Sequence, residues 1–182
     1  MRNTLLVAGL SASVLAIVCL TPGSPLFAQT GGSSSNKFVQ DFEKHWATAK
    51  ALAVAVAQAM PAENYSFKPV PAEMSFGEQM MHITSANYGY CAFLGGSKSP
   101  YQKPQTTTKE EIVKGLAESF DYCSTIFDGV TDAQLDQVRG TGDHAVDGRE
   151  LMLGVLVHMS HHRGQSEVYL RLKGITPPEY KW

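Results

Sequence analysis

The chain is poor in cysteine, and its cysteines are widely separated. Among 182 residues there are three, Cys19, Cys91 and Cys123, and no two of them are spaced as Cys-x-x-Cys. This spacing excludes a thiolate zinc site and a redox dithiol of the usual kind. In an oxidising compartment Cys91 and Cys123 could pair, and two buried free cysteines are the alternative that the sequence leaves open.

The chain also lacks an excess of charge of either sign. It has 15 Lys and Arg against 17 Asp and Glu, a formal net charge of −2, and no basic block. Nucleic acid is therefore a poor candidate partner, because a surface that binds it needs clustered positive charge. The sequence has no P-loop, dinucleotide glycine motif, His-Glu-x-x-His motif or nucleophile elbow either, which removes the enzyme classes that those motifs identify.

Long apolar runs are absent except at the N-terminus. Arg2 is followed by a largely apolar, uncharged stretch over residues 4–20, then by helix-breaking residues and by Ala28. This pattern predicts a signal peptide over residues 1–28 and hence an exported protein, periplasmic or secreted, with an uncleaved membrane anchor as the alternative. Cleavage would remove Arg2, take the net charge from −2 to −3, and leave no integral membrane segment.

After a Gly/Ser-rich leader, predicted to be flexible over residues 29–35, the patterns are those of helices. Ser75 with Glu78 and Thr108 with Glu111 form capping boxes. In a capping box, the side chain of the first residue accepts from the backbone N–H of the residue three positions later, whose own side chain accepts from the backbone N–H of the first. Apolar residues then recur every three or four positions, and no stretch alternates as a strand would. We predict long helices over 36–60, 76–94, 109–127 and 148–173, with a helical turn over 131–135. One domain over residues 36–182, an all-α four-helix bundle, is the natural packing.

The last predicted helix carries half of the six histidines within residues 158–162. Steps of three and four residues place one narrow stripe on it: Leu151, Val155, His158, His162, Gln165, Tyr169 and Leu172. Such a stripe is normally a buried seam, where an imidazole is costly unless something satisfies it. A metal ion would do so, because histidines at i and i+4 can reach one ion from one helical face.

A third imidazole lies on another predicted helix. His82 is near the middle of residues 76–94, and the small residues Ala86 and Gly89 leave space around it. If the two helices are adjacent, the three rings can meet at one level. Three neutral imidazoles suit a divalent transition metal such as zinc, nickel, iron or copper, with coordination positions left for water or substrate. The alternative is a set of core histidines that form hydrogen bonds with their neighbours.

Four further residues are weaker candidates for the site. His161 lies about 100° around the helix from His162, which suits a supporting or helix-packing role. Gln165 and Tyr169 share the histidine stripe, so they could orient ligands or simply pack. His45, on the first helix, could line a pocket or lie at the surface. The expected pocket walls include three tyrosines, Tyr88, Tyr90 and Tyr169.

Three stretches of this sequence resemble the DinB family. They are the run His158-Met159-Ser160-His161-His162-Arg163-Gly164-Gln165, the segment 170–178 that follows it, and the earlier segment 75–87. The resemblance covers essentially all of the chain after the leader. It implies a four-helix bundle with up-down-down-up topology and a divalent metal held by His82, His158 and His162. Characterised relatives include thiol S-transferases that use small thiol cofactors and a thiol-dependent isomerase.

These expectations combine into two functional hypotheses. In the first, the chain is an exported DinB-like protein in which the metal activates a water or a thiol, making it a hydrolase or a thiol or group transferase for an unknown small molecule. In the second, it is a non-catalytic metal- or ligand-binding protein, related to stress, on the same scaffold. The sequence identifies no general base and leaves open whether the protein is an enzyme and whether it forms a homodimer.

Overall fold

The computed structural model describes residues 36–104 and 107–180, and the predicted signal peptide and leader lie outside that part of the chain. The described residues contain no β-strand, only one isolated bridge between Arg139 and Val146. The helices are α1 (Lys37–Ala59), α2 (Phe76–Leu94), α3 (Lys109–Gly129), the short α4 (Asp132–Asp136) and α5 (Gly148–Leu172), with 3₁₀ turns at Ala62–Asn64 and Gly142–His144. The predicted all-α class is confirmed.

Local capping chemistry sets the helix ends. The Ser75 hydroxyl accepts from the Glu78 backbone N–H at 3.2 Å, and the Glu78 carboxylate accepts from the Ser75 backbone N–H at 2.6 Å. The same reciprocal pair occurs at the start of α3, and Asp147 caps α5. Gly174, with φ of +73°, follows the end of α5 in the left-handed conformation that glycine favours.

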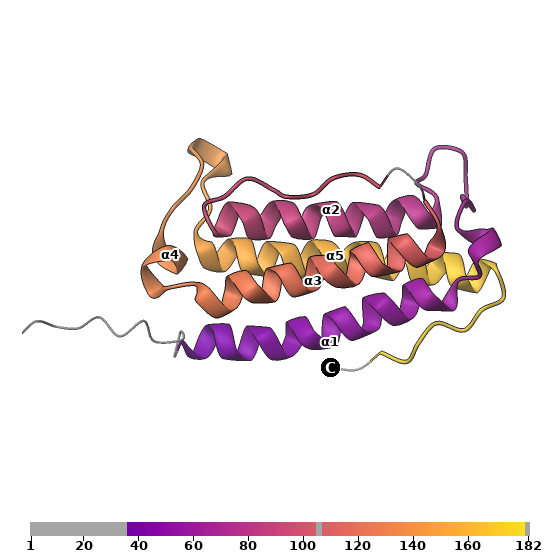
Figure 1. The fold of residues 1–182 in the computed structure, drawn as a ribbon, viewed down its shortest axis with the longest axis horizontal. Helices are drawn as coiled ribbons and strands as arrows, with labels where there is room; N and C mark the ends of the chain where they lie inside the picture. Colours follow the sequence, from indigo (N-terminus) through magenta and orange to yellow (C-terminus); the bar gives the residue numbers. More distant parts are fainter. Residues whose placement is uncertain (1–35, 105–106, 181–182) are drawn as a thin grey trace, which may run out of the picture. The chain divides into compact units, whose positions relative to one another are not determined.

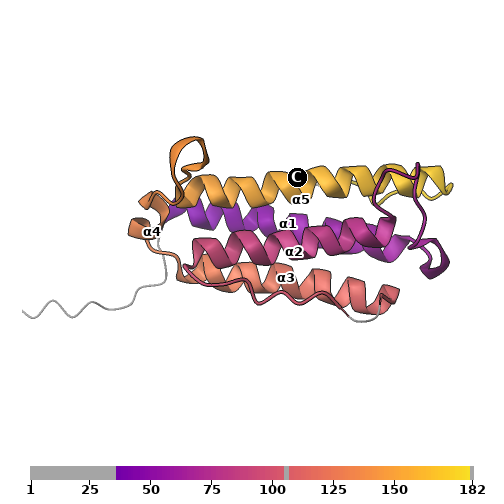
Figure 2. The ribbon, with the colours of Figure 1, turned by 90° about the horizontal axis from the view of Figure 1, so that it is seen from above.

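The four long helices pack in the cyclic order α1, α3, α2, α5 (Figures 1 and 2). Near its start α2 touches the start of α3, where Gly77 meets Ile112, and near its end it touches the end of α3, where Gly95 meets Ile126. These two neighbours therefore run parallel, and the chain between them returns along the bundle in both views. Such contacts are what an up-down-down-up course would produce, and that finer topology stays a prediction.

Aromatic side chains fill the core between α1 and α3. Trp46 is buried, its ring centroid is 4.6 Å from that of Phe120, and its indole N–H donates to the Phe120 carbonyl at 3.2 Å. Phe42 and Phe127 meet edge to face at 5.1 Å. Each large ring removes apolar area from water, and the buried indole N–H keeps a hydrogen-bond partner.

A disulfide links α2 to α3. Cys91 and Cys123 are bonded, with their Cα atoms 5.3 Å apart and both side chains buried. One turn earlier on each helix, the Asn87 side-chain amide donates to the Ser119 hydroxyl at 3.1 Å. The structure thus selects the paired state from the two that the sequence left open, and it keeps both sulfurs away from the histidine seam.

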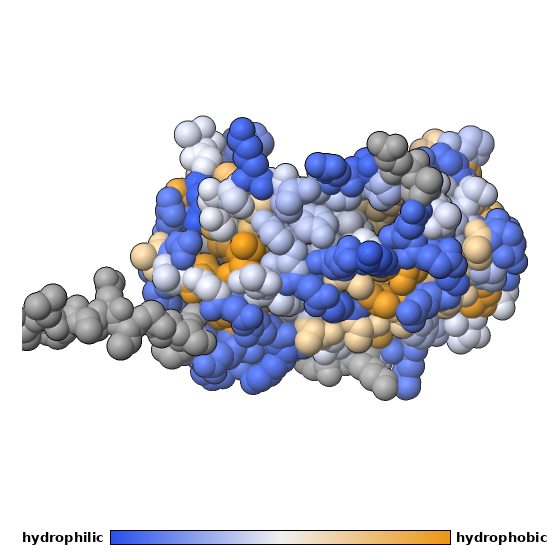
Figure 3. Space-filling view, viewed as in Figure 1, coloured by the Kyte–Doolittle hydropathy of each residue, from blue (hydrophilic) through white to orange (hydrophobic). Residues whose placement is uncertain are grey.

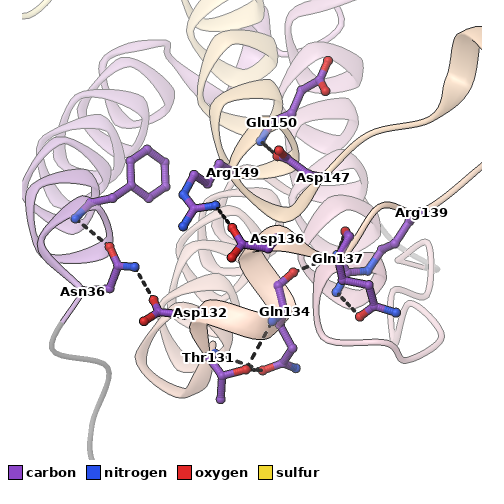
Figure 4. A network of polar contacts seen from close by, with 11 residues as sticks. Asn36, Thr131, Asp132, Gln134, Asp136, Gln137, Arg139, Asp147, Arg149 and Glu150 are labelled. Carbon is purple, nitrogen blue, oxygen red and sulfur yellow. Dashed lines mark hydrogen bonds and ion pairs between the residues drawn. The ribbon is translucent and has the colours of Figure 1, made fainter.

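At one end of the bundle, α4 and the loop after it join several elements (Figure 4). Asp132 accepts a hydrogen bond from Asn36, the N-cap of α1, and Asp136 pairs with Arg149 of α5. The Arg139 guanidinium donates to the Leu94 carbonyl at the end of α2, at 3.0 Å. These contacts fix the entry of the chain into α5, the helix that carries two of the three candidate ligands.

At the other end, residues 61–75 bring the chain from α1 to α2. The Tyr65 hydroxyl donates to the Ala57 carbonyl at 2.6 Å, and the Gly77 backbone N–H donates to the Tyr65 carbonyl at 2.8 Å. A Cβ at Gly77 would lie 3.2 Å from that carbonyl oxygen, so glycine allows this close approach. The contact fixes where α2 begins, and therefore the level at which His82 enters the bundle.

The face of the bundle seen in Figure 3 is largely hydrophilic, with separate small apolar patches. Among the described residues, none of the helices combines the length and the apolar character needed to cross a membrane.

Candidate metal centre

Three histidines meet at the seam between α2 and α5. The ring centroids of His82, His158 and His162 are 4.4 to 4.9 Å apart, so they form a nearly equilateral triangle. One nitrogen from each ring lies within 4.8 Å of the other two. All three histidines are partly exposed, so the cluster is not sealed from solvent. The geometry allows these histidines to hold one metal ion.

Helical spacing and helix pairing together produce this triangle. His158 and His162 are four residues apart on α5, so their rings project from one face. α2 packs along that face, and His82 reaches the same level from it. Farther along the seam Tyr90 lies against Gly154, where a Cβ would be 3.2 Å from the tyrosine ring. The absent side chain lets the Tyr90 ring come within 5.9 Å of the His158 ring, centroid to centroid.

Two glutamines fix the orientation of His162. Its Nδ1 lies 2.8 Å from Oε1 of Gln79 and 2.9 Å from Oε1 of Gln165. Amide oxygens only accept hydrogen bonds, so Nδ1 carries the proton and Nε2 keeps its lone pair for a ligand. The Gln79 amide NH₂ also donates to Gln165 Oε1 at 3.2 Å, which holds the two glutamines together. This is the arrangement that commonly supports a metal-binding histidine.

His158 is held in a drier environment. Burial, together with the neighbouring histidines, lowers its pKa to about 4, and burial also lowers the pKa of His162. At neutral pH both rings are therefore uncharged, which is the form that coordinates metal. His158 Nε2 lies 3.1 Å from Nε2 of His82, while its buried Nδ1 has no protein partner among the described residues. Neutral nitrogens converging at this spacing fit a divalent transition metal.

The weaker candidates occupy different surroundings. Gln165 contacts His162, whereas Tyr169 donates its hydroxyl to the Met74 carbonyl at 2.9 Å and packs on Phe67, so it holds the connection between α1 and α2. His161 is exposed beside His162, with the ring centroids 5.0 Å apart. His45 lines a cleft of about 410 Å³ between α1 and α5.

The expected pocket walls are only partly brought together. Tyr90 lies by the histidines, but Tyr88 faces another side of α2, where it contacts Tyr101 and Tyr122. The residue that sequence reasoning did not select is Gln79, which is buried and bound to His162. Its position three residues before His82 was the available signal, because i and i+3 share a helical face.

Comparisons with known proteins agree with this architecture. A model of the DinB family matches residues 33–181. The uncharacterized protein YjoA of Bacillus subtilis is 29% identical over 147 residues, which span 78% of this chain and 92% of that protein. The crystal structure of the DinB-like YjoA has a TM-score of 0.66 at 25% identity, over 80% of this chain and 96% of that one.

Two further solved structures show the same fold. A DinB-like protein from Bacillus cereus has a TM-score of 0.68 at 20% identity, covering 78% of this chain and 97% of its own. A member of the DinB family from Exiguobacterium sibiricum has a TM-score of 0.60 at 18% identity, covering 81% and 97%. At these identities the likeness concerns the fold alone.

Proposed function

Because the chain belongs to the DinB family, we propose that it binds a divalent transition metal, such as zinc, nickel or iron, through His82, His158 and His162. We further propose that it uses this centre as a hydrolase or as a thiol or group transferase for a small molecule. The observation that carries the proposal is the triangle of imidazoles, with one nitrogen of each ring within 4.8 Å of the others.

The residues of the site divide the work between binding and orientation. The three imidazoles would hold the ion and leave positions for water or substrate. Gln79 and Gln165 keep Nε2 of His162 unprotonated and fix the plane of its ring. A bound metal would supply Lewis-acid chemistry, lowering the pKa of a coordinated water or thiol. Tyr90, against His158, provides an apolar wall beside the site.

A second candidate function is metal or ligand binding without turnover, in a stress-related role. It is favoured by the position of His161, whose ring centroid is 5.0 Å from that of His162. His161 lies outside the group of three histidines whose nitrogens converge, so its exposed side chain would have to turn toward the ion to close the coordination sphere. Closed spheres are typical of structural or storage sites.

We also propose that the protein is exported. Support comes from the disulfide between Cys91 and Cys123, since such bonds persist in oxidising compartments, and from the signal-like composition of residues 1–28. Mass spectrometry of protein recovered from the periplasm or medium of an expressing bacterium should give a chain that begins near Gln29. A full-length chain confined to the cytoplasm would contradict export.

Metal analysis tests the centre directly. Protein purified without added chelator should contain about one metal ion per chain, and His158→Ala should reduce this to a small fraction of that value. His161→Ala is the matched control and should keep its metal under either candidate function, because it leaves all three histidines of the triangle in place. Equal metal content in wild type and His158→Ala, with both folded, would refute the proposed ligand set.

Cobalt substitution separates the two candidate functions. In an open site, an added small thiol would enter the coordination sphere and change the visible spectrum of bound Co²⁺. In a site closed by His161, the spectrum would stay unchanged with thiol in wild type and would respond only in His161→Ala. A response in wild type supports the enzyme; a response only in the variant supports the binding protein.

A further inference from the structure

A second cavity lies away from the histidines, between α2, α3 and the segment 95–104. It measures about 830 Å³, within the range of small-molecule sites, and three tyrosines from three separate elements line it. Tyr88 comes from α2, Tyr122 from α3 and Tyr101 from the segment, which returns along these two helices in Figures 1 and 2. The proposed metal chemistry makes no use of this cavity.

The three rings form one contiguous aromatic surface. Tyr88 and Tyr101 are nearly parallel, with an interplanar angle of 27° and centroids 6.0 Å apart. Tyr88 and Tyr122 are tilted by 45°, with centroids 5.0 Å apart. All three side chains are half-buried, so their rings support one another while part of each remains open to the cavity.

The charges around the rings are mainly negative. Glu111 and Glu118 of α3 both line the cavity, against one cation, the exposed Lys114, which lies 3.7 Å from Glu118. Burial raises the pKa of the Tyr88 hydroxyl, and the negative charges of Glu118 and Asp121 raise it further. The carboxylates of Glu111 and Glu118 and the electron-rich faces of the tyrosine rings therefore present negative potential to the same cavity.

We propose that this cavity binds a small, positively charged quaternary or methylated ammonium ion. Aromatic faces attract such a cation by its interaction with the ring quadrupole, and its methyl groups make it easier to remove from water than a plain ammonium ion. Tyr88, Tyr101 and Tyr122 supply the faces, and Glu118 supplies the opposite charge. The same carboxylates disfavour zwitterions such as betaines, whose own carboxylate they would repel.

Titration calorimetry with choline and its uncharged isostere 3,3-dimethylbutan-1-ol tests the role of charge. The two molecules have nearly the same shape, so an apolar cavity would bind them equally. We expect choline to bind in the millimolar range or tighter, and at least about tenfold tighter than the alcohol, which corresponds to one or two cation–π contacts. Equal affinities, or no binding of choline, would overturn the proposal.

Variants of Tyr101 locate the site, because this ring lies outside the helices and its loss should leave the fold intact. Tyr101→Leu should weaken choline binding at least threefold, whereas Tyr101→Phe should keep it, since the ring face is retained. Tyr180→Leu, at an exposed tyrosine away from the cavity, is the control and should bind as wild type. Wild-type affinity in Tyr101→Leu would place the ligand elsewhere and refute this assignment.

Two more measurements define the ligand and its independence. His158→Ala should bind choline as wild type does, because the cavity and the metal centre share no residue. Free choline and a phosphatidylcholine surface carry the same cation, so sedimentation with phosphatidylcholine vesicles distinguishes them. The protein should stay in the supernatant; vesicle binding without measurable binding of free choline would overturn the small-molecule assignment.

Discussion

Two adjacent histidines on α5 have different environments. His162 points into the seam with α2, where two glutamine oxygens accept from its Nδ1. His161, about 100° around the helix from it, is exposed and meets the His162 ring at an interplanar angle of 80°. A single residue step therefore separates a candidate ligand from a surface side chain, and it makes the pair a matched set for substitution.

Gln79 offers a sharper test of how His162 is oriented. Gln79→Leu keeps the volume of the buried side chain but removes one of the two acceptors on Nδ1. Loss of such a supporting partner typically weakens metal binding about 10- to 100-fold. We expect the metal affinity of Gln79→Leu to fall by an amount near the lower end of that range, because Gln165 still accepts from Nδ1. Competition with a chromogenic chelator would measure it.

Tyr169→Phe is the control for that variant. Tyr169 is on the same stripe of α5, but its hydroxyl binds the Met74 carbonyl and no histidine. Metal affinity should stay at the wild-type value, while stability falls by about 1 kcal/mol for the lost hydrogen bond. If Gln79→Leu bound metal as tightly as wild type, the assigned role of Gln79 would be wrong.

At the scale of the element, a capping box sets the register of α2. Ser75 and Glu78 cap each other, and Lys68 lies 3.1 Å from the Glu78 carboxylate. The backbone N–H of Ser75, with Lys68 as a second cause, holds the pKa of Glu78 down to about 2. His82 is four residues further on, so the start of the helix also decides where that imidazole lies.

Glu78→Ala should therefore destabilise the protein in a pH-dependent way. A lowered folded-state pKa means that the ionised carboxylate stabilises the fold above its unfolded pKa near 4.5, and that this contribution is lost as pH falls toward 2. Because the side chain is about half-exposed, solvent screening limits the effect to about 1 kcal/mol at pH 7. Urea denaturation at pH 7 and pH 3 would measure it, and a difference that does not shrink in acid would contradict this origin.

The helix starts were predictable because capping acts within three residues. Ser75 and Thr108 are N-caps in the structure, as their capping boxes predict, and Asn36 and Asp147 cap α1 and α5. The pairing of Gln79 with His162 could not be read in this way, because it depends on how far α2 is shifted along α5. The tyrosines of the second cavity come from three elements, and no periodicity within one segment could have grouped them.

For the molecule as a whole, the histidine triangle was predictable from spacing and family resemblance, but the state of the cysteines was not. Cys91 and Cys123 are 32 residues apart, and only the parallel packing of α2 and α3 brings their Cα atoms to 5.3 Å. Composition allowed both a disulfide and two buried thiols, and packing decided between them.

Removing the disulfide should lower global stability. A cross-link that closes a loop of this length restricts the unfolded chain by about 3–4 kcal/mol, as estimated from loop-closure entropy. We expect Cys91→Ala with Cys123→Ala to lose about that amount in urea denaturation, with the free energy extrapolated to water. A reductant should destabilise wild type but leave the double variant unchanged. Equal stability of the two proteins without reductant would contradict this expectation.

The same bond changes what a protease can release. Lys98 is exposed in the segment after α2, between the two bonded cysteines, and it offers trypsin a cleavage site there. A single cut would divide the polypeptide in two, yet the pieces would remain covalently joined and migrate together on a non-reducing gel. They would separate only after reduction. The bundle could thus be nicked and still keep all four long helices, and both halves of the histidine seam, in one covalent molecule.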